Sequence, residues 1–139
     1  MKALLEFLLR YLDFFYLDPR YRITNSTTSG VANINASLRL TGPVISWEIS
    51  NDRGQIGFGA APTKFSESPD NWFRISLIRQ YLDGFDELNA VSSAETVSWI
   101  RDNIDRIEQL FTDSSATHSC EELIALAKSL AIKYWGPPS

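Results

Sequence analysis

The chain of 139 residues has little of the chemistry that most enzymes use, with one cysteine and one histidine. A single cysteine excludes an internal disulfide and is typical of a protein in a reducing compartment. No segment approaches the roughly 20 uninterrupted apolar residues that a membrane-spanning helix needs. Residues 1–5 resemble the start of a signal peptide, but charged residues interrupt the apolar run and no cleavage site follows. We therefore expect a cytoplasmic protein that does not bind a membrane.

The few chemically reactive residues are poorly arranged for catalysis. His118 and Cys120 lie two positions apart near the expected start of the last helix, where the helix dipole can lower a thiol pKa. Residues at this spacing do not face each other on a helix, and two ligands are too few for a zinc site. Gly57 and Gly59 lack the third glycine and the lysine of a phosphate-binding loop, and they leave a flat strand surface that a partner can approach. We expect no metal and no cofactor.

Basic residues are scarce in the second half of the chain. Between residues 83 and 122, ten acids accompany only two arginines, which gives a net charge of −8, whereas the remainder carries +4. Such a region repels nucleic acid and favours a basic protein partner. The solvated faces of ordinary helices would explain the same acids.

Alternating apolar and polar residues predict an antiparallel sheet with one buried and one solvated face. The pattern continues through three segments that are separated by turn signals, residues 31–41, 44–50 and 56–61. A short strand over residues 21–25 precedes them. The sequence therefore predicts a meander of three to four strands.

Helical spacing of apolar residues predicts one helix before the strands and two to three after them. The first spans residues 2–16. Its expected buried stripe is Leu5, Leu8, Leu9, Leu12 and Phe15. The meander packed against these helices makes a single α+β domain.

The boundaries of the later helices follow from capping and stop signals. Residues 72–83 fit either a strand or a helix, and Gly84 as a stop favours a helix over residues 75–83. Capping-box patterns predict that the last two helices begin at Ser92 and at Ser119.

Residues 45–56 contain the pattern W-x-I-x-N-D-R-G-Q across two strands and their turn. This pattern resembles a strand–turn–strand of small uncharacterised bacterial proteins, which continue with a Trp-Phe segment, a Tyr-Leu-Asp-Gly helix end and an Ile-Glu-Gln-Leu-Phe ending, as this chain does at residues 72–73, 81–84 and 107–111. More loosely, the chain is similar to immunity proteins of bacterial toxin systems, which are small, acidic, cytoplasmic and without catalytic residues. The resemblance implies a fold and a binding role, and it transfers no site residues.

The helix expected over residues 94–111 carries the candidate interface. Its spacing places Glu95, Trp99, Asp102 and Arg106 on one side, and an exposed tryptophan in a charged rim is typical of an interface hot spot. Packing of Trp99 against a neighbouring helix would explain the same spacing. The predicted partner-binding residues are Asp83, Asp86, Glu87, Glu95, Trp99, Asp102, Asp105 and Arg106.

We expect an immunity or antitoxin-like protein rather than an enzyme, which binds a basic toxin domain and occludes its active site. One alternative is a homodimeric structural or assembly protein that buries the aromatic side of the first helix, Phe7, Tyr11 and Phe14. Another is a small-molecule enzyme that uses Glu48 and Asp52 beside the 51–54 turn, which requires a concave polar pocket next to both carboxylates.

Overall fold

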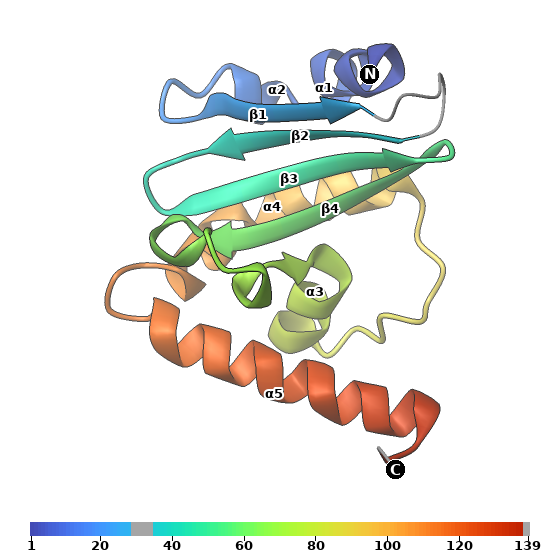
Figure 1. Cartoon of the computed structure of the whole chain (residues 1–139), viewed down its shortest axis with the longest axis vertical. Helices are drawn as coiled ribbons and strands as arrows, with labels where there is room; N and C mark the ends of the chain where they lie inside the picture. Colours follow the sequence, from blue (N-terminus) through green and yellow to red (C-terminus); the bar gives the residue numbers. More distant parts are fainter. Residues whose placement is uncertain (29–34, 138–139) are drawn as a thin grey trace.

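The computed structural model describes residues 1–28 and 35–137 and confirms the predicted α+β fold (Figure 1). Its centre is a single sheet of five strands, all antiparallel, in the order of the sequence. The strands are β1 (Arg22–Thr28), β2 (Asn35–Thr41), β3 (Ile45–Asp52), β4 (Gln55–Pro62) and β5 (Phe73–Arg74). The first four are the predicted meander, and residues 31–34 of the expected second strand lie outside the described residues. The two-residue β5 adds a strand beyond the three to four expected.

Within the described residues, five helices complete the fold. They are α1 (Lys2–Tyr11), α2 (Asp13–Tyr16), α3 (Ile75–Asp83), α4 (Ser93–Leu110) and α5 (Ala116–Trp135), with short 3-10 turns at Thr63–Phe65 and Pro69–Asn71 between β4 and β5. Within the described ranges, no helix has the length and apolar character needed to cross a membrane.

The inner face of the sheet forms the hydrophobic core under the helices. Helix α1 contacts β2 and β3, and Figure 1 shows α4 crossing behind β3 and β4. The ring of Trp47, fully buried on β3, lies 5.0 Å from the ring of Phe15 on α2. The strand side chains buried on this face include Leu38, Leu40, Ile45, Trp47, Ile49, Phe58 and Ala60. Their removal from water holds the helices against the sheet.

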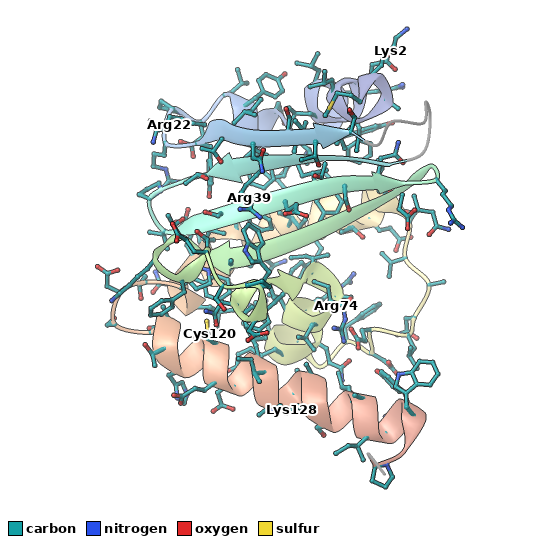
Figure 2. The ribbon with its side chains drawn as sticks, in the orientation of Figure 1. Lys2, Arg22, Arg39, Arg74, Cys120 and Lys128 are labelled. Atoms are coloured by element: carbon teal, nitrogen blue, oxygen red, sulfur yellow. The ribbon has the colours of Figure 1, made fainter. Side chains whose placement is uncertain are left out.

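The outer face of the sheet is polar and only partly covered. Arg39, Glu48 and Gly59 lie opposite one another across β2, β3 and β4, and Arg74 follows on β5. Figure 2 shows the Arg39 side chain on this open side. One face of the sheet is therefore buried and the other is solvated, as the alternation of apolar and polar residues predicted.

The N-terminal helix differs from the prediction in its continuity and in its buried stripe. The chain breaks at Leu12, with φ −116° and ψ 36°, so residues 2–16 form two helices. Leu5 and Leu9 are exposed, at 39% and 62%. The buried stripe is Leu4, Leu8, Leu12 and Phe15. Helical spacing allows either Leu4 or the pair Leu5 and Leu9 to accompany Leu8 and Leu12 in the buried stripe. The way in which α1 packs on the sheet decides that Leu4 is buried.

The helix over residues 75–83 is confirmed, since α3 has those bounds and ends at Gly84, whose φ is 68°. The capping serine of α4 is also confirmed, because the Glu95 N–H donates to Ser92 Oγ at 3.2 Å. The predicted start of the last helix at Ser119 is wrong. Helix α5 begins at Ala116, and the Ser119 N–H is already bonded within the helix to the Ser115 carbonyl at 2.9 Å.

Candidate binding surfaces

Three of the predicted partner-binding residues meet where α3 ends against α4. The Trp99 indole N–H donates to Asp83 Oδ2 at 2.9 Å. Arg106 donates to Asp83 Oδ1 at 2.8 Å and to the Leu82 carbonyl at 3.2 Å. The hydrogen bonds from Trp99 and Arg106 lower the pKa of Asp83. These contacts tie two helices together.

Trp99 is buried, with 9% of its surface exposed, and the expectation of an exposed tryptophan in a charged rim is wrong. Helical spacing correctly placed Trp99 on the flank of the apolar stripe. The end of α3 then covers that flank, which only the tertiary structure can show. Trp99 can contribute to a partner surface by holding α4 in place.

Glu87 also has an internal role. Only 6% of its side chain is exposed, and its carboxylate accepts two hydrogen bonds from Arg74, at 2.7 and 2.8 Å, and one from Ser76 at 3.1 Å. The Arg74 guanidinium lowers the pKa of this carboxyl. Asp86, one residue earlier, is exposed and accepts a hydrogen bond from the Leu88 N–H.

The other predicted acids form an outward stripe on α4. Glu95, Asp102 and Asp105 are exposed, and positions seven and three residues apart lie on the same side of a helix. None of the three forms an ion pair within residues 1–28 and 35–137. Of the eight predicted residues, these three and Asp86 are exposed acids without an ion pair among the described residues, and only these three share one side of α4.

A groove of about 580 Å³ lies on the outer face of the sheet beside Trp72. Arg39 donates to Glu48 at 3.1 Å, and its guanidinium carbon lies 4.4 Å from the centre of the Trp72 ring. The Trp72 indole N–H donates to the Ser66 carbonyl at 2.7 Å, which fixes the ring. The lining of the groove mixes polar and apolar side chains, and of its two carboxylates Glu48 is paired with Arg39.

Glu48 and Asp52 do not form an acid–base pair. They lie four residues apart on β3, which separates their Cα atoms by roughly 13 Å at about 3.3 Å per residue. Both side chains project across the strand rather than along it, so the carboxyl groups stay far apart. The paired carboxyl groups of glycoside-hydrolysing sites lie about 5–9.5 Å apart. Asp52 borders a neighbouring hollow of about 370 Å³ rather than the groove beside Glu48.

His118 and Cys120 do not form a reactive pair. The His118 side chain is 73% exposed, and its Nε2 lies 3.3 Å from Glu122 Oε1. Cys120 is buried, and burial raises the pKa of its thiol, so the nucleophilic thiolate is disfavoured. No three metal-binding side chains come together in the described part of the chain.

The aromatic side of the first helix packs largely within the molecule. The Phe7 ring lies 4.9 Å from Tyr11 and 6.1 Å from Phe58 on the sheet, and Phe14 lies 4.5 Å from Phe15. Phe7 and Phe14 are half-buried and Tyr11 is 37% exposed. The most exposed apolar residues of this region are Leu9 and Leu17.

One pocket contains residues that the sequence did not single out. Arg79 and Phe85 line a cavity of about 200 Å³ with Trp99 and Glu87. The Arg79 guanidinium carbon lies 3.8 Å from the centre of the Phe85 ring. The sequence does contain a signal for this pocket. Arg79 lies one turn after Ile75 on the apolar side of a helix, and a charged side chain in that position needs either a bonding partner or a cavity.

No protein-family model, curated protein or solved structure matches the chain. The resemblance to a bacterial family with the W-x-I-x-N-D-R-G-Q pattern therefore stays a prediction.

Proposed function

We propose that the protein binds a basic protein partner through the outward face of α4, and that it acts as an inhibitor of the immunity or antitoxin type. The observation that carries this proposal is the stripe of Glu95, Asp102 and Asp105, three exposed carboxylates without an ion pair among the described residues. A row of like charges on one rigid face attracts and orients a basic surface.

The arginines of the same region support this assignment, because they are occupied elsewhere. Arg106 is hydrogen-bonded to Asp83, and Arg101 lies 3.9 Å from Asp13 on α2 and donates to the Tyr11 carbonyl. Neither neutralises the carboxylate stripe. The field outside α4 is therefore negative.

The packing of α4 suits it to carry an interface. Val97, Ile100 and Ile107 are almost fully buried against the core, and Ser92 caps the first turn. A surface that is already ordered loses little conformational entropy on binding. The mechanism is occlusion: a stable interface of about 1,600 Å² in total would cover the active site of a partner enzyme without any chemistry in this chain.

The test reverses the charge of the stripe. We expect the variant Glu95→Lys/Asp102→Lys/Asp105→Lys to lose a stoichiometric basic partner that the tagged wild-type protein retains from lysate of its own host at low salt. With the identified partner purified, the association rate constant of the wild type should fall steeply as ionic strength rises. The partner's own activity should be blocked at a one-to-one ratio.

The matched control is Glu6→Lys/Glu67→Lys/Asp70→Lys, which makes the same change in net charge at exposed acids outside α4. This control should keep the partner. Equal loss with both triple variants would reduce the effect to net charge and refute the α4 surface. A partner that binds but keeps its activity would refute inhibition.

A further inference from the structure

Arg79 on α3 is a partly buried arginine that donates no hydrogen bond to any of the residues that the structure describes. Its guanidinium lies against two rings, 3.8 Å from the centre of Phe85 and 5.7 Å from that of Trp99. Its Nε is buried without a partner. No carboxylate or carbonyl in the described part of the chain accepts a hydrogen bond from Arg79. By contrast, Arg74 donates to both oxygens of one carboxylate, and Arg106 donates to three acceptors.

The nearest carboxylates accept their hydrogen bonds from groups other than Arg79. Glu87 lines the same cavity, but both of its oxygens accept hydrogen bonds from Arg74. Asp83, one turn further on α3, is held by Trp99 and Arg106. Arg79 interacts with Asp83 through charge alone, and of the three arginines at this place it is the one whose guanidinium donates no hydrogen bond within the described residues.

The cavity beside Arg79 has the form of a small-ligand site. It measures about 200 Å³, less than the roughly 300–1,000 Å³ of pockets for drug-sized ligands. Phe85, Trp99 and Val91 provide apolar walls, and Asn89 and Thr96 add polar groups. A small anion with a flat or short apolar body would fill such a space.

We propose that this cavity binds the carboxylate of a small organic monoanion, with the guanidinium of Arg79 as its anchor. A guanidinium matches a carboxylate geometrically, because two parallel N–H donors meet two oxygens. Because Nε is buried, the terminal Nη1 and Nη2 are the donors for the ligand, which approaches end-on. Since the guanidinium already covers the face of Phe85, the apolar body of the ligand packs against Val91 and Trp99. The nearby Glu87 carboxylate disfavours a more highly charged phosphate.

This site is distinct from the acidic stripe of α4 and does not rest on the inhibitor function. Its ligand is a small anion, whereas the stripe attracts a basic protein. Trp99 links the two places structurally, since its ring borders the cavity and its indole N–H is bonded to Asp83. Either proposal can fail without the other.

The test uses benzoate and butyrate as probes, titrated into the wild-type protein and followed by the NMR signals of the Trp99 indole N–H and the Arg79 side chain. We expect saturable shifts of both signals with benzoate. Benzamide, which has the same ring and no charge, should bind at least tenfold more weakly. Equal binding of benzoate and benzamide, or no shift with either acid, would overturn the proposal without the use of any variant.

Substitutions then assign the anchor. Arg79→Met should abolish benzoate binding, and Arg79→Lys, which keeps the charge but loses the two-donor geometry, should weaken it about tenfold. The control Arg101→Met removes an exposed arginine at a distance from the cavity and should bind as the wild type does. Unchanged benzoate affinity in Arg79→Met would refute Arg79 as the anchor.

Discussion

Arg79 and Asp83, one turn apart on α3, differ in how completely their side chains are hydrogen-bonded. Both Asp83 oxygens are bonded, to Trp99 and to Arg106, whereas no group in the described ranges accepts a hydrogen bond from Arg79. Buried donors without acceptors are uncommon in proteins because each costs about 1–3 kcal/mol. Asp83, Trp99 and Arg106 therefore stabilise the contact between α3 and α4, whereas the guanidinium of Arg79 can still donate to a ligand.

The bond between Trp99 and Asp83 gives a prediction for stability. Trp99→Phe keeps an aromatic ring but removes the indole donor, so Asp83 loses one of its partners. We expect the free energy of unfolding to fall by about 1.5–3 kcal/mol, as for a hydrogen bond to a charged group. Urea denaturation measures it. The control Trp135→Phe, at a side chain that is 86% exposed, should change stability by less than about 0.5 kcal/mol, and a similar fall in both variants would contradict the role of the bond.

The elements differ in how firmly their own sequences define them. Helix α4 has a capping serine, a buried stripe and a start within one residue of the prediction. Helix α5 has a capping pattern at Ser119 that lies inside the helix, because Ala116 to Ser119 continue it backwards through bonds to Thr112 and Ser115. A serine followed by acids thus indicates a helix start only when the residues before it do not extend the helix.

The cap of α4 can be tested as an element. Ser92→Ala removes the side-chain acceptor of the Glu95 N–H and should lower the free energy of unfolding by about 1 kcal/mol. Ser98→Ala, at an exposed position in the middle of the same helix, should be neutral or slightly stabilising because alanine has the higher helix propensity. Thermal or urea unfolding monitored by circular dichroism compares the two. Equal stability of both variants would show that the cap contributes nothing.

In the whole molecule, ion pairs join segments that are distant in the sequence. Arg74 on β5 holds Glu87 beyond α3, Asp83 on α3 holds Arg106 on α4, and Arg20 before β1 lies 3.1 Å from Glu108 on α4. The sheet, α3 and α4 are therefore joined by charge as well as by the apolar core. Such bonds make the stability of the molecule depend on pH.

The pKa values of Glu87 and Asp83 are lowered in the folded protein, so the unfolded chain binds more protons as the pH falls. The stabilisation that these two carboxyls contribute should be fully present above their usual titration range. It should decrease as the pH falls through and below that range. Glu87→Gln should be less stable at neutral pH and should show a shallower acid loss. Urea midpoints between pH 7 and pH 2 measure both. The exposed substitution Glu67→Gln serves as the control, and a Glu87→Gln curve parallel to the wild type would contradict the assignment.

The strand alternation and the end of α3 follow from the sequence alone, whereas the break at Leu12 and the start of α5 do not. Alternation in β2 to β4 and the Gly84 stop of α3 depend on near neighbours in the chain, and the predictions from them are confirmed. The low content of cysteine and histidine likewise limits the reactive groups that any fold of this chain can bring together. Local patterns succeed here because side-chain period and backbone geometry are properties of a few consecutive residues.

Which side chains reach the surface depends on tertiary packing. Leu5 and Leu9 satisfy helical spacing but are exposed, Trp99 is covered by the end of α3, and Arg79 is left without an acceptor. Each outcome depends on which element packs against which, and the contacting residues are far apart in the chain or compete on one helix. The sequence therefore indicated that α4 is acidic. Only the tertiary structure distinguished its exposed acids, Glu95, Asp102 and Asp105, from Trp99 and Arg106, which bond α4 to α3.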